Sequence, residues 1–529
     1  MSRSFDVTAV PPWVKYVVLF SSGSVIMLYA ERAYRRYVVR QVIRRRKERA
    51  KKAIEHLRTQ LKEQQVDTKL STDILSMTVM ELHNALQSGK LKAVDVLLAY
   101  QRKAMQENDR LNFMTEPIHG AMGEDSTVGV ASLIGEAASD DAVLVKVLKD
   151  QGAVPFVRTN VPQTMLSVDC SNPIYGKSLN PRDTNRTPGG SSGGEAASLA
   201  AGASILGIGS DIAGSIRIPS HFCGVTGLKP TQGRLSTKGM RSLTKPQNIV
   251  IGTGGPMARD VDGVVLLMRA MLSPLHFQLD PSIPPIPFQE KEFSDTRRLR
   301  IGYYTSHGYA DPVPSCRRAV FVAKEALEKN GHTLVEFEPP RIPYAMSHLY
   351  MKVMNGDGGQ TLADYLKDDV VDPSMKMVIF NSRQPLRVRH FLASLAGWLY
   401  KKYREEFYDA WTRLRLDIVI CPAFGFVAPP YGNLDKSFGG GLFAPTYNLV
   451  NYPAGCLPVT SVSTADIDDL KTYPQNTMFE KTMKKVSEGS EGLPVGVQVV
   501  GQKWQEELVL RVMKEIERNV LNTVSKQHA

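Results

Sequence analysis

The fold is decided by PGGSSGGEAASLAAGASILGIGSDIAGSIRIPS, residues 188–220, in which glycine and serine gather at both ends. The interval between the two ends, AASLAAGASILGIG (196–209), is small and apolar. A flexible glycine–serine linker contains no such interval, so a linker is excluded. The segment instead predicts a buried helical element that holds two polar loops, 188–195 and 210–220, in register.

Two familiar loop motifs contain glycine and serine at such a density. A phosphate-binding loop of the Walker type requires GxxxxGK[ST], and the segment has no such lysine. The GxSxG pattern of a nucleophile elbow occurs in two overlapping frames, centred on Ser191 and Ser192. A glycine–serine run produces that pattern by chance, and NPRDTNRTP (180–188) before it does not resemble a strand.

A third interpretation uses both loops in one active site. Glycines allow backbone N–H groups to turn towards a single point, where they stabilise a negatively charged oxygen. Ser215 is then the nucleophile, and the N–H groups of Ile212, Ala213 and Gly214 form the oxyanion hole. Ser191, from the first loop, relays the proton of the nucleophile.

The composition is that of a globular intracellular protein. The chain has 529 residues, of which 43% are hydrophobic and 22% charged, so wholesale disorder is excluded. Its five cysteines are odd in number and form no CxxC pair, which argues against a disulfide framework and a zinc site. The cysteines are Cys170, Cys223, Cys316, Cys421 and Cys456. We therefore expect a reducing compartment.

The N-terminus predicts attachment to a membrane. An uncharged run from Tyr16 to Ala30 is followed by a strongly basic segment, residues 31–52. A secretory signal carries its basic residues before the apolar run, so we expect a single-pass anchor in an endomembrane such as the endoplasmic reticulum, with the remaining chain in the cytoplasm. A basic coil lying on anionic lipid is the alternative. No nucleic-acid-binding motif accompanies the basic residues, so a nucleic-acid partner is not expected.

The predicted organisation has three parts, an anchor at residues 1–30, a basic helical stalk at 31–70 and a catalytic domain at 71–529. Within the domain, strands at LRIGYY (299–304) and LDIVICP (416–422) alternate with helical patterns. Further expected elements are a helix over RRAVFVAKEALEKNG and strands at HTLVEFE and PVGVQVVG (494–501). This alternation predicts an α/β fold with helices on both faces of a sheet.

One helical segment of the domain, at about 386–403, is amphipathic. An apolar stripe lies between basic residues, as in a helix that lies in a membrane interface, although core packing explains such a stripe equally well. The stripe is formed by Val388, Phe391, Leu392, Leu395, Trp398 and Leu399. The upstream anchor favours the membrane interpretation.

The two loops together closely resemble the signature of the amidase signature family of serine hydrolases. The resemblance extends over residues 71–529 and includes QGAVPFVRTNVPQTMLSVDCSNPIYGKSLNP (151–181), GPMARDVDG (255–263) and LPVGVQVVGQKWQEEL (493–508). Because of the predicted N-terminal anchor, the chain most resembles the membrane-bound members of the family, which cleave long-chain fatty acid amides. The resemblance implies an α/β fold with a large mixed central β-sheet, a homodimer, and no metal or organic cofactor.

The resemblance also assigns site residues. The family uses a Ser–Ser–Lys triad, in which the nucleophile matches Ser215 and the bridging serine, which follows a cis peptide bond, matches Ser191. Oxyanion and substrate contacts match Met165, Ile212, Ala213 and Gly214, and structural support matches Ser192, Asp211 and Arg217. The family has glycine at the position of Ala213, whose N–H is retained here.

The chain departs from the family at the lysine of the triad. In the family this lysine ends a strand in a GVPVSLKE-like stretch, but here GEDSTVGVAS (123–132) follows LNFMTEPIHGAM (111–122) directly. There is no lysine between Lys103 and Lys146. Lys146 and Lys149 lie beyond the gap on a predicted helix, and we expect both to face solvent.

The missing lysine leaves three functional hypotheses open. The first is a fatty acid amide hydrolase whose activity is lowered, because loss of a general base costs on the order of 10²–10⁴ in rate. The second is a non-catalytic, membrane-bound protein that binds lipid amides or modulates a dimer. The third is an esterase with a nucleophile elbow, for which His332, His348 and His390 are the available histidines.

Overall fold

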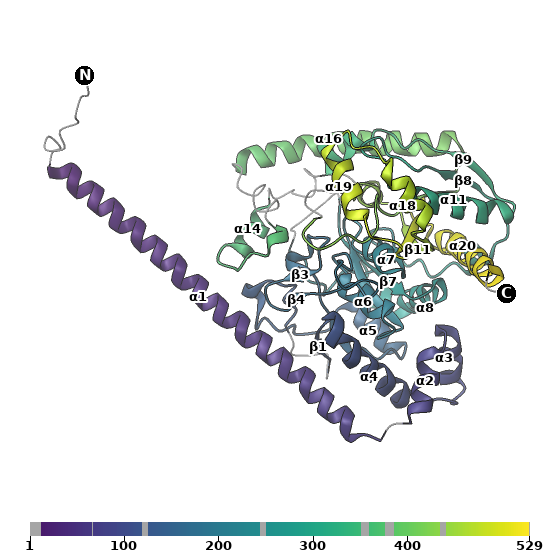
Figure 1. Ribbon diagram of the computed structural model, residues 1–529, viewed down its shortest axis with the longest axis horizontal. Helices are drawn as coiled ribbons and strands as arrows, with labels where there is room; N and C mark the ends of the chain where they lie inside the picture. The colour runs from purple at the N-terminus through teal and green to yellow at the C-terminus, as the bar shows by residue number, and fades with distance from the viewer. Residues whose placement is uncertain are drawn as a thin grey trace.

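The computed structural model describes residues 12–65, 67–118, 125–243, 250–350, 359–375, 386–433 and 441–527, the backbone alone being described in 12–26, 28, 386–398 and 522–527. In the described chain, one large sheet is surrounded by helices, and a long N-terminal helix extends away from them (Figure 1).

Eight strands form the main sheet, in the order β5-β7-β6-β11-β12-β10-β8-β9. The strands of the chain are β1 (Met114–Pro117), β2 (Val157–Thr159), β3 (Ser171–Asn172), β4 (Gly176–Lys177), β5 (Leu206–Asp211), β6 (Thr226–Lys229), β7 (Thr253–Ala258), β8 (Arg300–Tyr303), β9 (Thr333–Glu336), β10 (Ile418–Pro422), β11 (Ala454–Ser461) and β12 (Pro494–Gly501). β10, β8 and β9 pair in parallel, whereas the other pairs of the main sheet are antiparallel. The predicted mixed central sheet is therefore confirmed.

Helices cover this sheet on both faces. The helices are α1 (Pro12–Glu63), α2 (Thr68–Ser76), α3 (Val79–Gln87), α4 (Ala93–Leu111), α5 (Val143–Asp150), α6 (Gly193–Ala200), α7 (Arg217–Cys223), α8 (Val261–Met271), α9 (Pro274–Leu279), α10 (Glu290–Ser294), α11 (Pro314–Lys329), α12 (Ile342–Tyr344), α14 (Gln360–Leu366), α16 (Leu386–Arg413), α17 (Phe443–Leu449), α18 (Thr464–Lys471), α19 (Met478–Ser487) and α20 (Glu506–Gln527). A π-helix, η4, extends α12 over Ala345–Tyr350.

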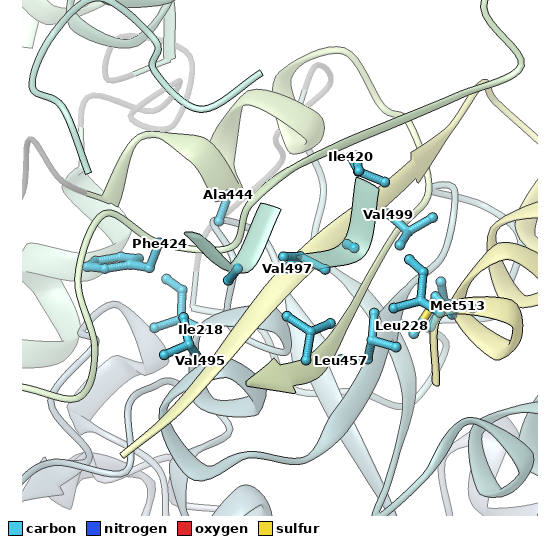
Figure 2. Close-up of a cluster of buried hydrophobic side chains, with 14 of the residues drawn as sticks. Ile218, Leu228, Ile420, Phe424, Ala444, Leu457, Val495, Val497, Val499 and Met513 are labelled. Carbon is cyan, nitrogen blue, oxygen red and sulfur yellow. The ribbon is translucent and has the colours of Figure 1, made fainter. Parts of the chain in front are cut away.

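The central strands send alternate side chains to opposite faces, as the two-residue period of a strand requires. In β10, Ile418 and Ile420 enter a buried cluster that includes residues of α7, α8, α11 and α20. Val419 and Cys421 enter a second cluster with residues of α16 and α17. Figure 2 shows Ile420 in the first cluster, among the labelled side chains of β11, β12 and α20. Burial on both faces explains why β10 reads as a continuous apolar run.

The sequence predicted the parallel half of the sheet but missed part of the antiparallel half. β8, α11, β9, β10 and β12 lie at the predicted positions. The interval after α6 was expected to be helical, but it leads into β5, whose sequence LGIGSD contains two glycines. A Cβ added at Gly209 would lie 2.7 Å from Met257 Sδ in β7. Close packing therefore requires glycines here, and glycines hide a strand from propensity-based prediction.

The described chain on either side of the expected lysine strand does not join the main sheet. β5 is one of the two edge strands of the main sheet, while β1 and β2 form a separate antiparallel pair. The junction at Met122 and Gly123, where the family resemblance implies a further stretch, lies outside the described residues.

The basic segment 31–63 is helical, as predicted, but it is more than a solvated stalk. One side of α1 packs on the domain, where Leu57 and Leu61 join a buried cluster with residues of α4 and β1. None of the helices in the described part of the chain combines the length and the apolar character needed to span a bilayer. Most of the predicted anchor at residues 16–30 falls where the backbone alone is described.

The amphipathic helix predicted at 386–403 corresponds to the first half of α16. The side chains of its apolar stripe lie outside the described residues, except for Leu399, which is half-buried. Beyond the stripe, Tyr400, Tyr403 and Trp411 enter the second core cluster. The end of α16 is therefore ordinary core, and the membrane interpretation of its beginning stays a prediction.

A buried ion cluster fixes α1 to the domain. Arg46 is 5% exposed and its Nη2 lies 2.7 Å from Glu116 Oε2 in β1 and 2.7 Å from Asp125 Oδ1. Arg158 Nη1 donates a hydrogen bond to the carbonyl oxygen of Asp125, at 2.7 Å. Glu116 and Asp125 stand on either side of the junction, so α1 and the chain on both sides of the junction share one cluster.

Substituting Arg46→Ala removes the closest cationic partner of these two buried carboxylates, although Arg158 remains 3.5 Å from Glu116, and we expect it to destabilise the docked helix by about 2 kcal/mol. Amide hydrogens of α1 between residues 39 and 61 should then exchange about 30-fold faster by mass spectrometry. Arg44→Ala is the matched control, because Arg44 forms an exposed i,i+4 pair with Glu48. Equal exchange in the two variants would contradict the prediction.

Candidate functional site

The two glycine–serine loops meet as the sequence predicted. The backbone N–H of Ser192, in the first loop, donates a hydrogen bond to the carbonyl oxygen of Ser215, in the second, at 3.1 Å. Ser192 Oγ also accepts a hydrogen bond from the N–H of Ser210, at 3.1 Å. Gly190 and Ser191 are joined by a cis peptide bond, as the family resemblance implies. The contacts of Ser192 are those of a structural residue.

The glycines of the first loop allow a close approach of neighbouring backbone. A Cβ added at Gly190 would lie 2.5 Å from the carbonyl oxygen of Ser167, and one at Gly194 would lie 2.5 Å from the backbone of Asn160. The segment that follows Met165 is thereby packed against the loop. Met165 itself is half-buried and has a φ of 61°. Its predicted contact with substrate stays a prediction.

Both serines of the predicted relay are buried. Ser191 is 2% exposed and Ser215 is 7% exposed. Ser215 lies in the turn between β5 and α7, and Ser191 precedes the first residue of α6 by two positions. The small residues between them form α6 and β5, so the interval does hold the two loops in register.

Asp211, at the end of β5, organises the second loop. Its carboxylate accepts hydrogen bonds from the N–H groups of Gly214, at 2.8 Å, and Ile216, at 3.1 Å. It also forms a 2.9 Å ion pair with Arg217 Nη2 and accepts a hydrogen bond from Asn448 Nδ2 at 2.9 Å. Burial by itself raises the pKa of Asp211, but Arg217 outweighs burial and the pKa falls to about 2. The carboxylate is therefore charged at neutral pH.

Arg217, the first residue of α7, carries this network to distant parts of the chain. It is fully buried, and its Nη1 donates hydrogen bonds to the carbonyl oxygen of Ala444 and to Gln498 Oε1, both at 2.7 Å. Its Nη2 donates to Asn448 Oδ1 at 2.6 Å. The structural support predicted for Asp211 and Arg217 thus joins the loop to α17 and β12. Neither Asn448 nor Gln498 belongs to a motif that would have identified it from the sequence.

The structure corrects the predicted oxyanion hole at one residue. The N–H of Gly214 points at Asp211 and is therefore not available to an oxyanion. Gly214 serves another purpose, because its φ is 108° and an added Cβ would lie 2.5 Å from Ala444 Cβ. Among the described residues, no hydrogen-bond acceptor is found for the N–H groups of Ala213 and Ser215. The other two predicted donors, the N–H groups of Ile212 and Ala213, stay candidates for the oxyanion hole.

The lysines beyond the gap lie where the sequence placed them. Lys146 and Lys149 are partly exposed on α5 and pair with Asp140 and Asp141. In the described part of the chain, neither Ser191 nor Ser215 is hydrogen-bonded to a lysine.

Sequence reasoning missed one lysine, Lys229 at the end of β6. It is 2% exposed, and its Nζ donates a hydrogen bond to the carbonyl oxygen of Pro230 at 2.8 Å. Burial and the charge of Arg217 lower the pKa of Lys229 to about 7, against the opposing effect of Asp211. A buried lysine with a lowered pKa gives up its proton more readily than an exposed lysine, and only burial revealed this property of Lys229.

The elbow hypothesis gains no support. No strand precedes Ser191 directly, since residues 178–192 have no regular structure before α6 begins. His332 Nδ1 accepts a hydrogen bond from the N–H of Leu299 at 3.0 Å, and its Nε2 pairs with Glu515. Both ring nitrogens of His332, which precedes β9, therefore already have hydrogen-bond partners. His390 lies outside the residues whose side chains are described.

The described residues contain no cluster of His, Cys, Asp or Glu side chains arranged to hold a metal ion. All five cysteines are buried and unpaired. Burial raises the pKa of Cys170 to about 12, so this thiol, which lies near the first loop, is a poor nucleophile.

Comparison with known proteins agrees with this geometry. A family model described as "Amidase" matches residues 118–510. The chain is similar to Fatty-acid amide hydrolase 1 of Sus scrofa, with 38% identity over 502 residues that cover 84% of this chain and 86% of that protein. It is also similar to Fatty acid amide hydrolase 1 of Caenorhabditis elegans, with 32% identity over 566 residues and coverage of 95% and 98%.

A solved structure named "Fatty acid amide hydrolase" has the same fold. It superposes with a TM-score of 0.75 over 92% of this chain and 95% of that chain, at 23% sequence identity. At that identity the superposition is evidence for the fold alone.

The depressed pKa of Asp211, about 2, predicts how stability depends on pH. In the unfolded chain an aspartate titrates near pH 4, so the shift contributes about 2 kcal/mol of stability above that pH, which is lost as the pH falls to about 2. Asp211→Asn should therefore lower the free energy of unfolding at pH 7, with a difference from wild type that shrinks between pH 4 and pH 2. Urea denaturation at each pH measures this, with the exposed Asp469→Asn as control. A difference that stays constant with pH would contradict the assignment.

Proposed function

This chain belongs to the amidase family of amide hydrolases, and on that premise we propose that it cleaves long-chain fatty acid amides with Ser215 as the nucleophile. The observation that carries the proposal is the meeting of the two loops, which brings the segments of Ser191 and Ser215 together around a rigid Asp211 network. The relatives from Sus scrofa and Caenorhabditis elegans, both named for fatty acid amides, support this class of substrate.

The proposed reaction has two stages. Ser215 Oγ attacks the amide carbonyl carbon, and the N–H groups of Ile212 and Ala213 stabilise the oxygen as it becomes negative. The Ser215 proton passes to Ser191 Oγ, while Ser191 gives its own proton to the departing amine. Water then attacks the acyl-enzyme ester, releases the fatty acid and returns a proton to Ser215.

We propose further that this reaction is slow in the chain as it stands. The relay from Ser215 to Ser191 needs a base to begin it, and the stretch that carries the family's lysine is missing from the sequence. The second candidate function follows from the same observation. Without turnover, the protein binds a lipid amide or its fatty acid, and it does so as the homodimer implied by the family resemblance.

Restoring the missing stretch separates the two functions. A lysine-bearing strand of the family type, inserted between Met122 and Gly123, supplies a general base and should raise hydrolysis of oleamide by at least about 10²-fold. Release of oleate by the full-length protein in detergent is the measurement. The unmodified chain should show a rate near background.

Two controls accompany this insertion. The same insertion with alanine in place of lysine repairs the chain without the base, and should stay at the rate of the unmodified chain. Ser215→Ala in the lysine version should abolish hydrolysis. Turnover at ordinary enzymatic rates without the insertion would overturn the slow-reaction proposal, and Lys229→Met would then show whether Lys229 is the base.

We also propose that α1 attaches the protein to the cytoplasmic side of an endomembrane. The face of α1 that packs on the domain includes Ile43, Arg46 and Leu57. At about 100° per residue, the opposite side of the helix carries two groups of exposed residues. One group is apolar or aromatic, namely Met27, Tyr34, Tyr37 and Val38, and the other is basic, namely Arg44, Arg45, Arg49 and Lys52.

This outward face fits a bilayer that contains anionic phospholipid. Met27 is 74% exposed, Tyr34 68% and Tyr37 59%. Such exposure is unusual for side chains of their size when they gather on one surface. Aromatic side chains favour the headgroup region, and basic side chains favour anionic lipids by about 1 kcal/mol each. The Arg46 cluster fixes the opposite side of α1 to the domain, so the aromatic group and the basic group both face away from the domain.

Removal of residues 1–30 should therefore leave the protein partly bound to vesicles of phosphatidylcholine with phosphatidylserine. In that truncated protein, replacing Arg45, Arg49 and Lys52 by glutamine should weaken binding at least about tenfold. The control replaces three exposed lysines elsewhere, Lys471, Lys481 and Lys485. Vesicle sedimentation measures binding, and complete release of the truncated protein at low salt would show that this face does not contact membrane.

A further inference from the structure

We propose that Tyr350 is a positioning residue, which orients the backbone N–H of Ala213 in the oxyanion hole. Tyr350 ends the π-helix η4, far in sequence from the two loops. Its hydroxyl donates a hydrogen bond to the carbonyl oxygen of Ile212, at 2.9 Å. The inference rests on the proposed function, in which Ile212 and Ala213 stabilise the reaction oxyanion.

The geometry of the peptide bond links this contact to the oxyanion hole. Among the described residues, the bond between Gly190 and Ser191 is the cis peptide. The peptide between Ile212 and Ala213 is therefore trans and planar, so its C=O and N–H groups point in opposite directions. When Tyr350 holds the carbonyl oxygen of Ile212 on one side, the N–H of Ala213 is fixed on the other side.

The remaining restraints of the loop act elsewhere. Asp211 binds the N–H groups of Gly214 and Ile216, which fixes the loop on the C-terminal side of Ala213. In the described contacts, Tyr350 is the side chain that binds the peptide between Ile212 and Ala213. Without that hydrogen bond this peptide can rotate between its fixed neighbours, and a rotated N–H no longer meets the oxyanion.

Tyr350 is itself held firmly. It is 4% exposed and belongs to the cluster that contains Tyr304, Tyr403 and Tyr447, against which Ile212 and Ala213 also pack. Burial raises the pKa of Tyr350 far above that of a free tyrosine, so its hydroxyl stays protonated and remains a donor. π-helical turns often occur at functional sites, which agrees with this placement.

The test compares Tyr350→Phe with Tyr304→Phe. Each variant removes one buried hydroxyl from the same cluster, but the hydroxyl of Tyr304 contacts that of Tyr447, at 2.9 Å, and not the loop. The probes are oleate, whose carboxylate requires the oxyanion N–H groups, and oleyl alcohol, which has the same chain without the charge. Calorimetric titration of the full-length protein with each probe gives two dissociation constants for every variant.

We expect Tyr350→Phe to weaken oleate binding about tenfold and to leave oleyl alcohol binding unchanged, because one orienting hydrogen bond to an anion site is worth about that factor. Tyr304→Phe should change neither. A merely structural role would weaken both probes equally, and that result would overturn the inference. So would a Tyr350→Phe variant that keeps the full preference for oleate.

The proposed function fails in a different way. If the wild-type protein binds oleate no better than oleyl alcohol, there is no anion site at Ile212 and Ala213, and the oxyanion role is refuted together with its positioning residue. If wild type prefers oleate and Tyr350→Phe retains that preference, the oxyanion hole stands and the inference about Tyr350 alone is wrong.

Discussion

The site depends above all on the buried ion pair between Asp211 and Arg217. Asp211 holds the second loop through two backbone N–H groups, while Arg217 reaches α17 and β12 through Ala444, Asn448 and Gln498. Removing one partner from such a pair leaves a charge buried in an apolar interior, which is strongly destabilising. The same contacts therefore fix the shape of the loop and attach it to α17 and β12.

The Asp211 network also explains why some backbone N–H groups of the second loop support the loop itself while others are left to bind a ligand. Those of Gly214 and Ile216 are turned inwards to the carboxylate, and those of Ala213 and Ser215 are left for other use. A loop with several N–H groups thus contains both its own support and a candidate anion site. Tyr350 adds a restraint from a third region of the chain, at the peptide between Ile212 and Ala213, which Asp211 does not bind.

The attachment of α1 to the domain involves residues near the junction at Met122 and Gly123, where the family resemblance implies a further stretch. Glu116 and Asp125 stand on either side of that junction, and both bind Arg46 of α1. The helix that we propose to contact membrane is therefore held by the residues that flank the expected base. β5 ends the main sheet beside this region, and β1 pairs with β2 alone.

The sequence by itself determined the family, the sheet with helices on both faces, and the pairing of the two loops. These features follow from local patterns, because β10 is a continuous apolar run, β12 is mostly apolar and the loops have an unusual density of glycine. Tertiary structure decided the rest: the use of the Gly214 N–H by Asp211, the lowered pKa of Lys229, the contact of Tyr350 with Ile212, and the docking of α1 through Arg46. Each of these depends on burial or on a contact between residues far apart in the chain, and a local pattern of residue types does not encode which distant group a side chain will meet.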